Sequence, residues 1–428
     1  ITIVNGDVMY LNNIPINIIN ENKFKKVMIR FCFFNEYNKE NITSYSLLAS
    51  VLTLSSKKYN DKKKKLDVIS DLYNTRLVFS NHYLYNTRIT FLTLNLINPH
   101  YTNDDNLLSR AIDMMYEFLL NPNVINESFE EKSFEEAKNN LLENLKKEYN
   151  SKPYCAYRRI NELMFNDEIF SCNPLGTKEE LEKITPKDLY KTYLDLINNS
   201  KKVIYAIGDC FDDLDKKLNK FNSLYSQNKV FDLVYKGKYD IKKVNIVKEK
   251  ANIKQAVLIL GYRTDISLVD TEIDALEIFV EMFGGITSSN LFRVVREQNG
   301  LCYSIEASLE NSKKVMFIDV GIEKENFNKT IELINCELEK YQNGEVDKEL
   351  FEIVKKESID STLENNDSFG GIFGLRFDNL LFNRNDTIET IKAKIEKITI
   401  DDIINVSHHL KLDTVYLLSE GSDNDDNA

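Results

Sequence analysis

An internal duplication constrains the fold of this chain more than any other feature of its sequence. Five pairs of similar segments occur in the same order in its two halves, at offsets of about 210 to 230 residues. The pairs are 26–34 with 256–264, 46–54 with 275–283, 133–152 with 350–369, 184–196 with 398–410, and 203–209 with 415–421. Such self-similarity indicates duplicated structural units. We therefore predict two homologous domains, at about 1–225 and 240–428, with a partly ordered connector between them.

Each half combines strand-like and helical patterns. Apolar strand-like runs at 27–34, 87–96 and 203–208 alternate with long amphipathic helical patterns. The clearest predicted helix covers 127–149, with Asn126 or Ser128 as its cap, and another begins at Thr185 and Pro186. The expected fold class is α+β, with two homologous halves, each a mainly antiparallel sheet with helices packed on one face. Two such halves could enclose a space between them.

Charge and cysteine usage narrow the function classes. The 428 residues carry a net charge of −12, which argues against nucleic acid as a partner. No apolar run approaches the roughly 20 residues that span a bilayer, and no basic segment precedes a hydrophobic stretch at the start. Six cysteines without a CxxC pair predict reduced thiols. We expect a cytoplasmic protein without a membrane partner.

The most specific stretch is GGITSSNLFRVVREQNGLCYSI at 284–305. Two glycines are expected to form a flexible turn, and Ser288 or Ser289 to start a helix that ends near Arg296. Asn299 and Gly300 then stop the helix, and the next strand carries Tyr303. A guanidinium and a phenol at one sheet edge could bind a peptide carbonyl or stabilise an oxyanion. A structural role for both side chains is the alternative.

This stretch resembles the Arg–Tyr motif of the pitrilysin-like metallopeptidases, the inverted-zinc family that includes insulysin and the mitochondrial processing peptidases. The resemblance covers nearly the whole chain, duplication included. It implies a clam-shell of two halves around a central chamber, with Arg296 and Tyr303 as substrate-binding residues. In that family the pair acts opposite an N-terminal zinc site.

The N-terminal half, where the family carries its zinc site, departs from the family pattern. The family carries HxxEH on its first long helix, but no two of the four histidines here (82, 100, 408 and 409) stand four or five residues apart. Matching the loop SSKKY places Ser46 and Ser50 at the two histidine positions and Ala49 at the catalytic glutamate. Serine is a poor zinc ligand, and alanine accepts no proton. Glu143, spaced from Glu136 as in the family's E-x6-E pattern, stands at the third ligand position. We expect no metal or other cofactor in this chain.

The resemblance implies a role within a pair of subunits. In two-component bacterial members one subunit carries HxxEH and the other the Arg–Tyr pair. The runs at 22–26, 72–77 and 152–165 are similar to the zinc-less member of a Gram-positive gene pair, a group associated with modification of elongation factor P. The favoured hypothesis is a subunit, inactive alone, that binds unfolded peptide beside a zinc-bearing partner.

Two other hypotheses stay open. The chain could be a binding or scaffold protein with no proteolytic role, acting as a homodimer or in translation-factor modification. It could also be an active peptidase with a relocated metal site, although two or more of the four histidines would have to converge from distant segments.

Overall fold

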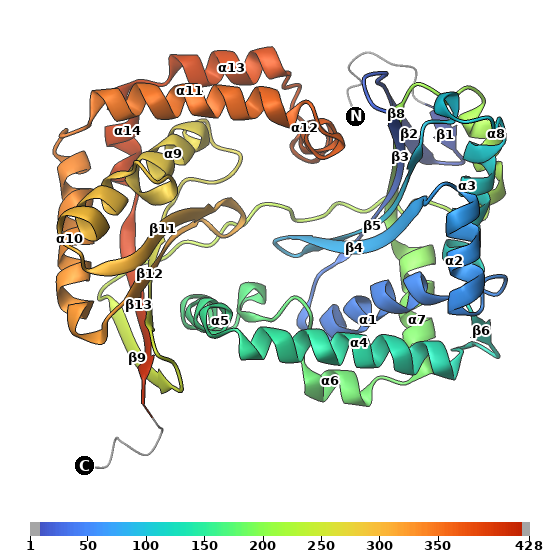
Figure 1. Ribbon diagram of the computed structural model, residues 1–428, viewed down its shortest axis with the longest axis horizontal. Coiled ribbons are helices and arrows are strands. Elements are labelled where there is room, and N and C mark those ends of the chain that lie inside the picture. Colours follow the sequence, from blue (N-terminus) through green and yellow to red (C-terminus); the bar gives the residue numbers. More distant parts are fainter. Residues whose placement is uncertain (1–8, 422–428) are drawn as a thin grey trace. The chain divides into compact units, whose positions relative to one another are not determined.

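The computed structural model describes residues 9–421 (Figure 1). The chain divides into two compact units that do not follow the sequence without interruption. The first unit runs to Lys147 and resumes over Cys172–Leu233, whereas the second comprises Glu148–Ser171 and the chain from Val234 onward. Residues 148–171, which belong to the N-terminal half of the sequence, therefore pack with the C-terminal unit.

The first unit is built on a six-stranded sheet in the order β1-β2-β8-β3-β5-β4. Its strands are β1 (Met9–Leu11), β2 (Ile14–Asn20), β3 (Lys26–Glu36), β4 (Arg76–Leu84), β5 (Thr87–Ile97) and β8 (Lys201–Gly208). All neighbours pair antiparallel except β2 and β8, which are parallel. Its helices are α1 (Ile42–Leu54), α2 (Lys62–Asp71), α3 (Leu107–Leu120), α4 (Glu131–Asn150), α6 (Lys178–Lys183), α7 (Pro186–Asn199) and α8 (Leu214–Leu218). Apolar side chains of α1, α3, α4 and α7 pack with those of the sheet in one core.

The second unit is built on a five-stranded sheet in the order β11-β12-β10-β13-β9. Its strands are β9 (Asn245–Ala251), β10 (Ala256–Arg263), β11 (Cys302–Glu310), β12 (Val315–Ile322) and β13 (Lys411–Glu420), of which only β9 and β13 pair parallel. Its helices are α5 (Lys152–Phe165), α9 (Ile273–Val280), α10 (Phe327–Gln342), α11 (Lys348–Asn365), α12 (Phe369–Phe382), α13 (Ile388–Lys397) and α14 (Ile400–Ser407). Figure 1 shows α9, α10 and α14 beside this sheet.

The two sheets share one strand order. Read from the opposite edge, β4-β5-β3-β8-β2 corresponds to β11-β12-β10-β13-β9, and in both sheets the one parallel pair occupies the same place. The five sequence pairs fall on matching elements: β3 with β10, α1 with α9, α4 with α11, α7 with α14, and β8 with β13. The expected α+β fold class, with mainly antiparallel sheets and helices in two similar halves, is confirmed.

Two predicted helix starts had different outcomes. The Thr185 hydroxyl accepts a hydrogen bond from the Asp188 amide at 3.2 Å, so α7 begins at Pro186 as predicted. The prediction of a helix from 127 was wrong, because Ser128 and Phe129 form β7, which pairs with β6 (Val124–Ile125). Helix α4 begins at Glu131 instead, and the Glu130 carboxylate accepts hydrogen bonds from its first amides. Glutamate is not a common cap residue, which explains why pattern reading missed it.

Helix α5 lies against the second sheet, on the face opposite its main core. Gly261 of β10 leaves the space for this contact, since a Cβ there would lie 2.3 Å from the Met164 sulfur. The buried Arg263 donates to the carbonyl of Met164 and, at 2.6 Å, to the Asp413 carboxylate. At the other end of the helix, Tyr157 donates to Glu310 at 2.7 Å. These contacts explain why segment 148–171 belongs to the second unit.

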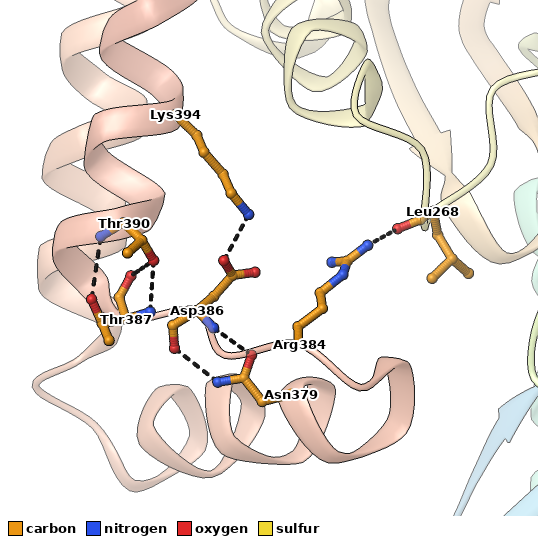
Figure 2. A network of polar contacts seen from close by, with 7 residues as sticks. All are labelled: Leu268, Asn379, Arg384, Asp386, Thr387, Thr390 and Lys394. Carbon is orange, nitrogen blue, oxygen red and sulfur yellow. Dashed lines mark hydrogen bonds and ion pairs between the residues drawn. The ribbon is translucent and has the colours of Figure 1, made fainter. Parts of the chain in front are cut away.

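The connection between α12 and α13 is held by polar contacts, shown in Figure 2. The Asn379 amide exchanges two hydrogen bonds with the backbone of Asp386, at 2.8 and 2.9 Å. Lys394 of α13 forms an ion pair with Asp386 at 2.7 Å, and Arg384 donates to the Leu268 carbonyl at 2.7 Å. Helices α12 and α13 are therefore tied both to one another and to the loop that precedes α9.

In the part of the chain that the structure describes, no helix is both long enough and apolar enough to cross a membrane.

Candidate functional site

The loop before Arg296 is ordered by close packing. Gly284 and Gly285 end a wide π-helical turn, η5 (Glu281–Gly285), that extends α9, so the expected flexible turn is not present at these residues. Gly284 is buried, and a Cβ there would lie 2.7 Å from the Ala307 Cβ on β11. A Cβ at Gly285 would meet the Glu281 carboxylate at 2.5 Å. Glycine is needed here because a strand and a side chain approach the backbone closely.

The next helical segment begins and ends as the sequence predicts. The Ser289 hydroxyl accepts from the Phe292 amide at 3.5 Å, ahead of the second wide turn, η6 (Phe292–Gln298). Gly300 has a φ of +59°, which glycine adopts readily, and its amide donates to the Arg296 carbonyl at 3.1 Å. The Leu301 amide donates to Val295 at 3.1 Å, which closes the turn into β11.

Tyr303 stands at an irregularity in the edge strand β11. Cys302 pairs with Ile322 of β12 and Ser304 pairs with Gly321, so Tyr303 is an extra residue in the ladder. A bulge of this kind redirects a side chain and is common next to active sites. The Tyr303 side chain is 58% exposed, and its hydroxyl donates to the Glu323 carboxylate. This hydrogen bond raises the pKa of Tyr303.

Arg296 is exposed and close to the same strand. Its guanidinium lies 4.6 Å from the centre of the Phe292 ring, and it forms no ion pair within residues 9–421. Burial raises the pKa of the Cys302 thiol to about 11, and the positive charge of Arg296 opposes that rise. Arg296 therefore acts electrostatically on the residue that precedes Tyr303. The structure brings the two predicted site residues together in one unit, with the Arg296 guanidinium exposed and the Tyr303 hydroxyl bonded to Glu323.

The positions of the degenerate zinc motif lie on α1 in the first unit. Ser46 is buried, and its hydroxyl donates to the Pro174 carbonyl at 3.0 Å, a carbonyl that the Tyr83 hydroxyl also contacts at 3.2 Å. Ala49 and Ser50 are half-buried, and Ala49 packs against the core of this unit. The motif positions thus serve the packing of α1, with no imidazole or carboxylate among them.

Glu143 lies on α4 and is exposed to solvent. It forms an ion pair with Lys146, one turn further along the helix, at 2.7 Å. The hydrogen bond from Lys146 lowers the pKa of Glu143. Within residues 9–421, no three His, Cys, Asp or Glu side chains come together in a way that could hold a metal ion.

Glu323 is the residue that sequence reasoning missed. It follows β12 and touches Tyr303 only because the strands β11 and β12 pair across a turn. No local motif marks it, so a signal could have come only from predicting that strand pairing correctly.

Comparisons with known proteins identify the relatives of this chain. The family model described as the peptidase M16 inactive domain matches residues 183–358, which include both Arg296 and Tyr303. The chain is 25% identical over 406 residues to the protein named "Probable inactive metalloprotease YmfF" of Bacillus subtilis (strain 168), covering 94% of this chain and 95% of that protein. The chain is a homologue of the M16 peptidases. The resemblance to the pitrilysin-like metallopeptidases is thereby confirmed.

Solved structures support an M16-like fold over nearly the whole chain. A conserved protein from Enterococcus faecalis V583 superposes with a TM-score of 0.91 at 26% identity, covering 96% of this chain and 97% of that one. A peptidase M16 inactive domain from Pseudomonas fluorescens superposes with a TM-score of 0.78 at 15% identity, covering 96% of both chains. The likeness to the second protein supports the fold alone.

Proposed function

We propose that the chain is a non-catalytic M16 subunit that binds unfolded peptide and contributes Arg296 and Tyr303 to a composite metallopeptidase site. The proposal rests on a contrast between the Arg–Tyr pair in one unit and the former zinc positions in the other. The substrate-side pair is present and exposed in one unit, whereas the α1 positions where the family carries its zinc ligands hold only hydroxyl and methyl groups. Without a metal-bound water, this chain has no means of its own to attack a peptide bond by the family's chemistry.

The peptide would bind along β11. This strand is the outermost of its sheet, so the backbone groups on its free edge have no partner strand within the described part of the chain. An extended peptide can add to such an edge through main-chain hydrogen bonds, which tolerate many sequences. Three side chains are exposed along β11 and would contact the side chains of the bound peptide: Tyr303, Ser304 and Glu306.

The partner would be a homologous subunit that carries HxxEH. A second copy of this chain would add another Arg–Tyr pair but no zinc ligands, so a homodimer would stay inactive. The six free thiols suit a reducing compartment, and we place the pair in the cytoplasm. We propose no role for membrane or nucleic acid.

Mixing the two subunits tests the proposal. Cleavage of unfolded peptides should require both chains, and Arg296→Ala or Tyr303→Phe in this chain should lower the rate at least tenfold, as expected for loss of one donor to a developing charge. Arg293→Ala is the matched control, because Arg293 is exposed on the same helical segment and its one ion pair within residues 9–421 is with Asp347, at 3.5 Å. If neither site substitution changes the rate of the mixture, the composite site does not exist.

A scaffold role without proteolysis is the second candidate. The observation that favours it is the hydrogen bond from Tyr303 to Glu323, which gives the hydroxyl a partner within the chain itself. A scaffold should bind its partner equally well with Arg296→Ala and Tyr303→Phe, and the complex should cleave no peptide. Quantitative pulldown followed by a peptidase assay separates the two functions.

A further inference from the structure

The hydroxyl of Tyr303 is engaged before any peptide arrives. It donates to the carboxylate of Glu323, which directly follows the last residue of β12. The pairing of Cys302 with Ile322 holds the two residues at the same end of the hairpin, and the extra residue in β11 directs Tyr303 toward it. Glu323 is itself exposed, so a ligand can reach both members of this pair.

This contact limits what Tyr303 can do. A phenol has one proton to donate, and a hydrogen bond to a carboxylate is roughly twice as strong as one between neutral groups. A peptide carbonyl, which is neutral, therefore competes poorly with Glu323 for that proton. A charged donor to Glu323 offsets the negative charge of the carboxylate, weakens its hydrogen bond with Tyr303 and so favours release of the hydroxyl to the carbonyl.

The surroundings favour a positively charged donor. Glu306 of β11 and Asp319 of β12 stand directly opposite one another on the same sheet face, and neither forms an ion pair within residues 9–421. Of the two lysines at the hairpin turn, Lys313 and Lys314, the first lies 3.7 Å from Glu310. Lys324, which follows Glu323, lines a groove of about 780 Å³ with Lys248 and forms no ion pair with Glu323. None of the three carboxylates Glu306, Asp319 and Glu323 forms an ion pair within the described residues.

We propose that Glu323 is a positioning residue that makes the Tyr303 site selective for cationic peptides. A lysine or arginine side chain of the peptide pairs with the Glu323 carboxylate, and the released Tyr303 hydroxyl donates to a peptide carbonyl. No covalent bond changes in this exchange. The inference rests on the proposed function, because it assumes that peptide binds beside Tyr303.

Two synthetic peptides test the exchange. They share one unfolded ten-residue sequence and differ at one central position, which is lysine in the first and norleucine in the second. Fluorescence anisotropy measures their affinities for the wild-type chain, Glu323→Gln, Tyr303→Phe and the control Glu325→Gln. Glu325 is exposed two residues beyond Glu323 and forms no contact with Tyr303.

The expected pattern is specific to the exchange. The wild-type chain and Glu325→Gln should bind the lysine peptide about two- to fivefold more tightly, as an exposed ion pair allows. Glu323→Gln should remove this preference and bind the norleucine peptide at least as tightly as the wild type does. Tyr303→Phe should weaken the binding of the lysine peptide, whose carbonyl loses the released hydroxyl, and leave the binding of the norleucine peptide nearly unchanged.

The outcomes separate this inference from the proposed function. If Tyr303→Phe weakens binding but Glu323→Gln leaves the lysine preference intact, the inference fails and the peptide site stands. An equal loss of preference in Glu325→Gln overturns the inference too, because the effect is then one of general charge. If the wild-type chain binds neither peptide, the proposed function fails and the inference fails with it.

Discussion

Replacing Asp319 by asparagine should stabilise the protein at neutral pH. The side chain is half-buried on β12, directly opposite Glu306 of β11. Burial, together with the negative charges of Glu306 and Glu310, raises the pKa of Asp319 from 3.8 to about 6. The folded state therefore disfavours the ionised carboxylate, whereas the unfolded chain ionises it freely. Two like charges directly opposite one another in a sheet repel and so destabilise the folded state.

The size of the gain follows from the two pKa values. A pKa shift of this size lowers the free energy of unfolding by about 3 kcal/mol when Asp319 is ionised in both the folded and the unfolded chain. Each pKa unit is worth about 1.4 kcal/mol. Asp319 is partly exposed, so solvent screening reduces the gain to about 1–2 kcal/mol. The destabilisation is fully present above the folded pKa and fades as the pH falls toward the unfolded value. The gain should therefore be roughly halved at pH 5.

Urea unfolding at pH 7.5 and at pH 5 measures this gain. The Asp319 carboxylate forms no hydrogen bond within residues 9–421, so asparagine loses no hydrogen bond. Asp360→Asn serves as the control, because Asp360 is exposed on α11 of the same unit and makes no contact there. A gain that is absent at pH 7.5, or that is equally large at pH 5, would refute the reasoning.

Three further substitutions probe packing and capping by equilibrium unfolding. Arg263→Met should lower the unfolding free energy by about 3–5 kcal/mol, because it leaves the Asp413 carboxylate without its partner; a loss below 1 kcal/mol contradicts the anchoring of α5. Gly284→Ala should cost about 1–3 kcal/mol, because the new Cβ meets Ala307; an unchanged midpoint would show that the loop adapts. Glu130→Ala should cost about 1 kcal/mol by removing the acceptor at the start of α4; no loss would mean that water caps the helix equally well.

The duplicated pattern predicted the fold class because each copy had to bury the same faces. Apolar residues of β3 and β10 recur at matching positions, and both strands lie at the centre of a sheet. The turn around Gly300 was also predictable, because its chemistry is local. A local sequence pattern of this kind predicts the structure correctly when tertiary contacts favour the same conformation.

Other features depend on partners far away in the sequence. The packing of α5 with the second unit depends on Arg263 and Gly261, about 100 residues further along the chain. Gly284 looked like a turn residue, but its role is set by a strand 23 positions away. Glu323 reaches Tyr303 only through the pairing of β11 with β12. Pattern reading along one segment cannot see such contacts.

The most direct test of the central claim combines metal analysis with peptide cleavage by the chain alone and after addition of a homologous HxxEH subunit. We predict that the isolated chain carries no stoichiometric zinc and cleaves nothing. The mixture should cleave unfolded peptides, with the zinc in the added subunit. Stoichiometric zinc in the isolated chain, or metal-dependent cleavage by it alone, would contradict the account.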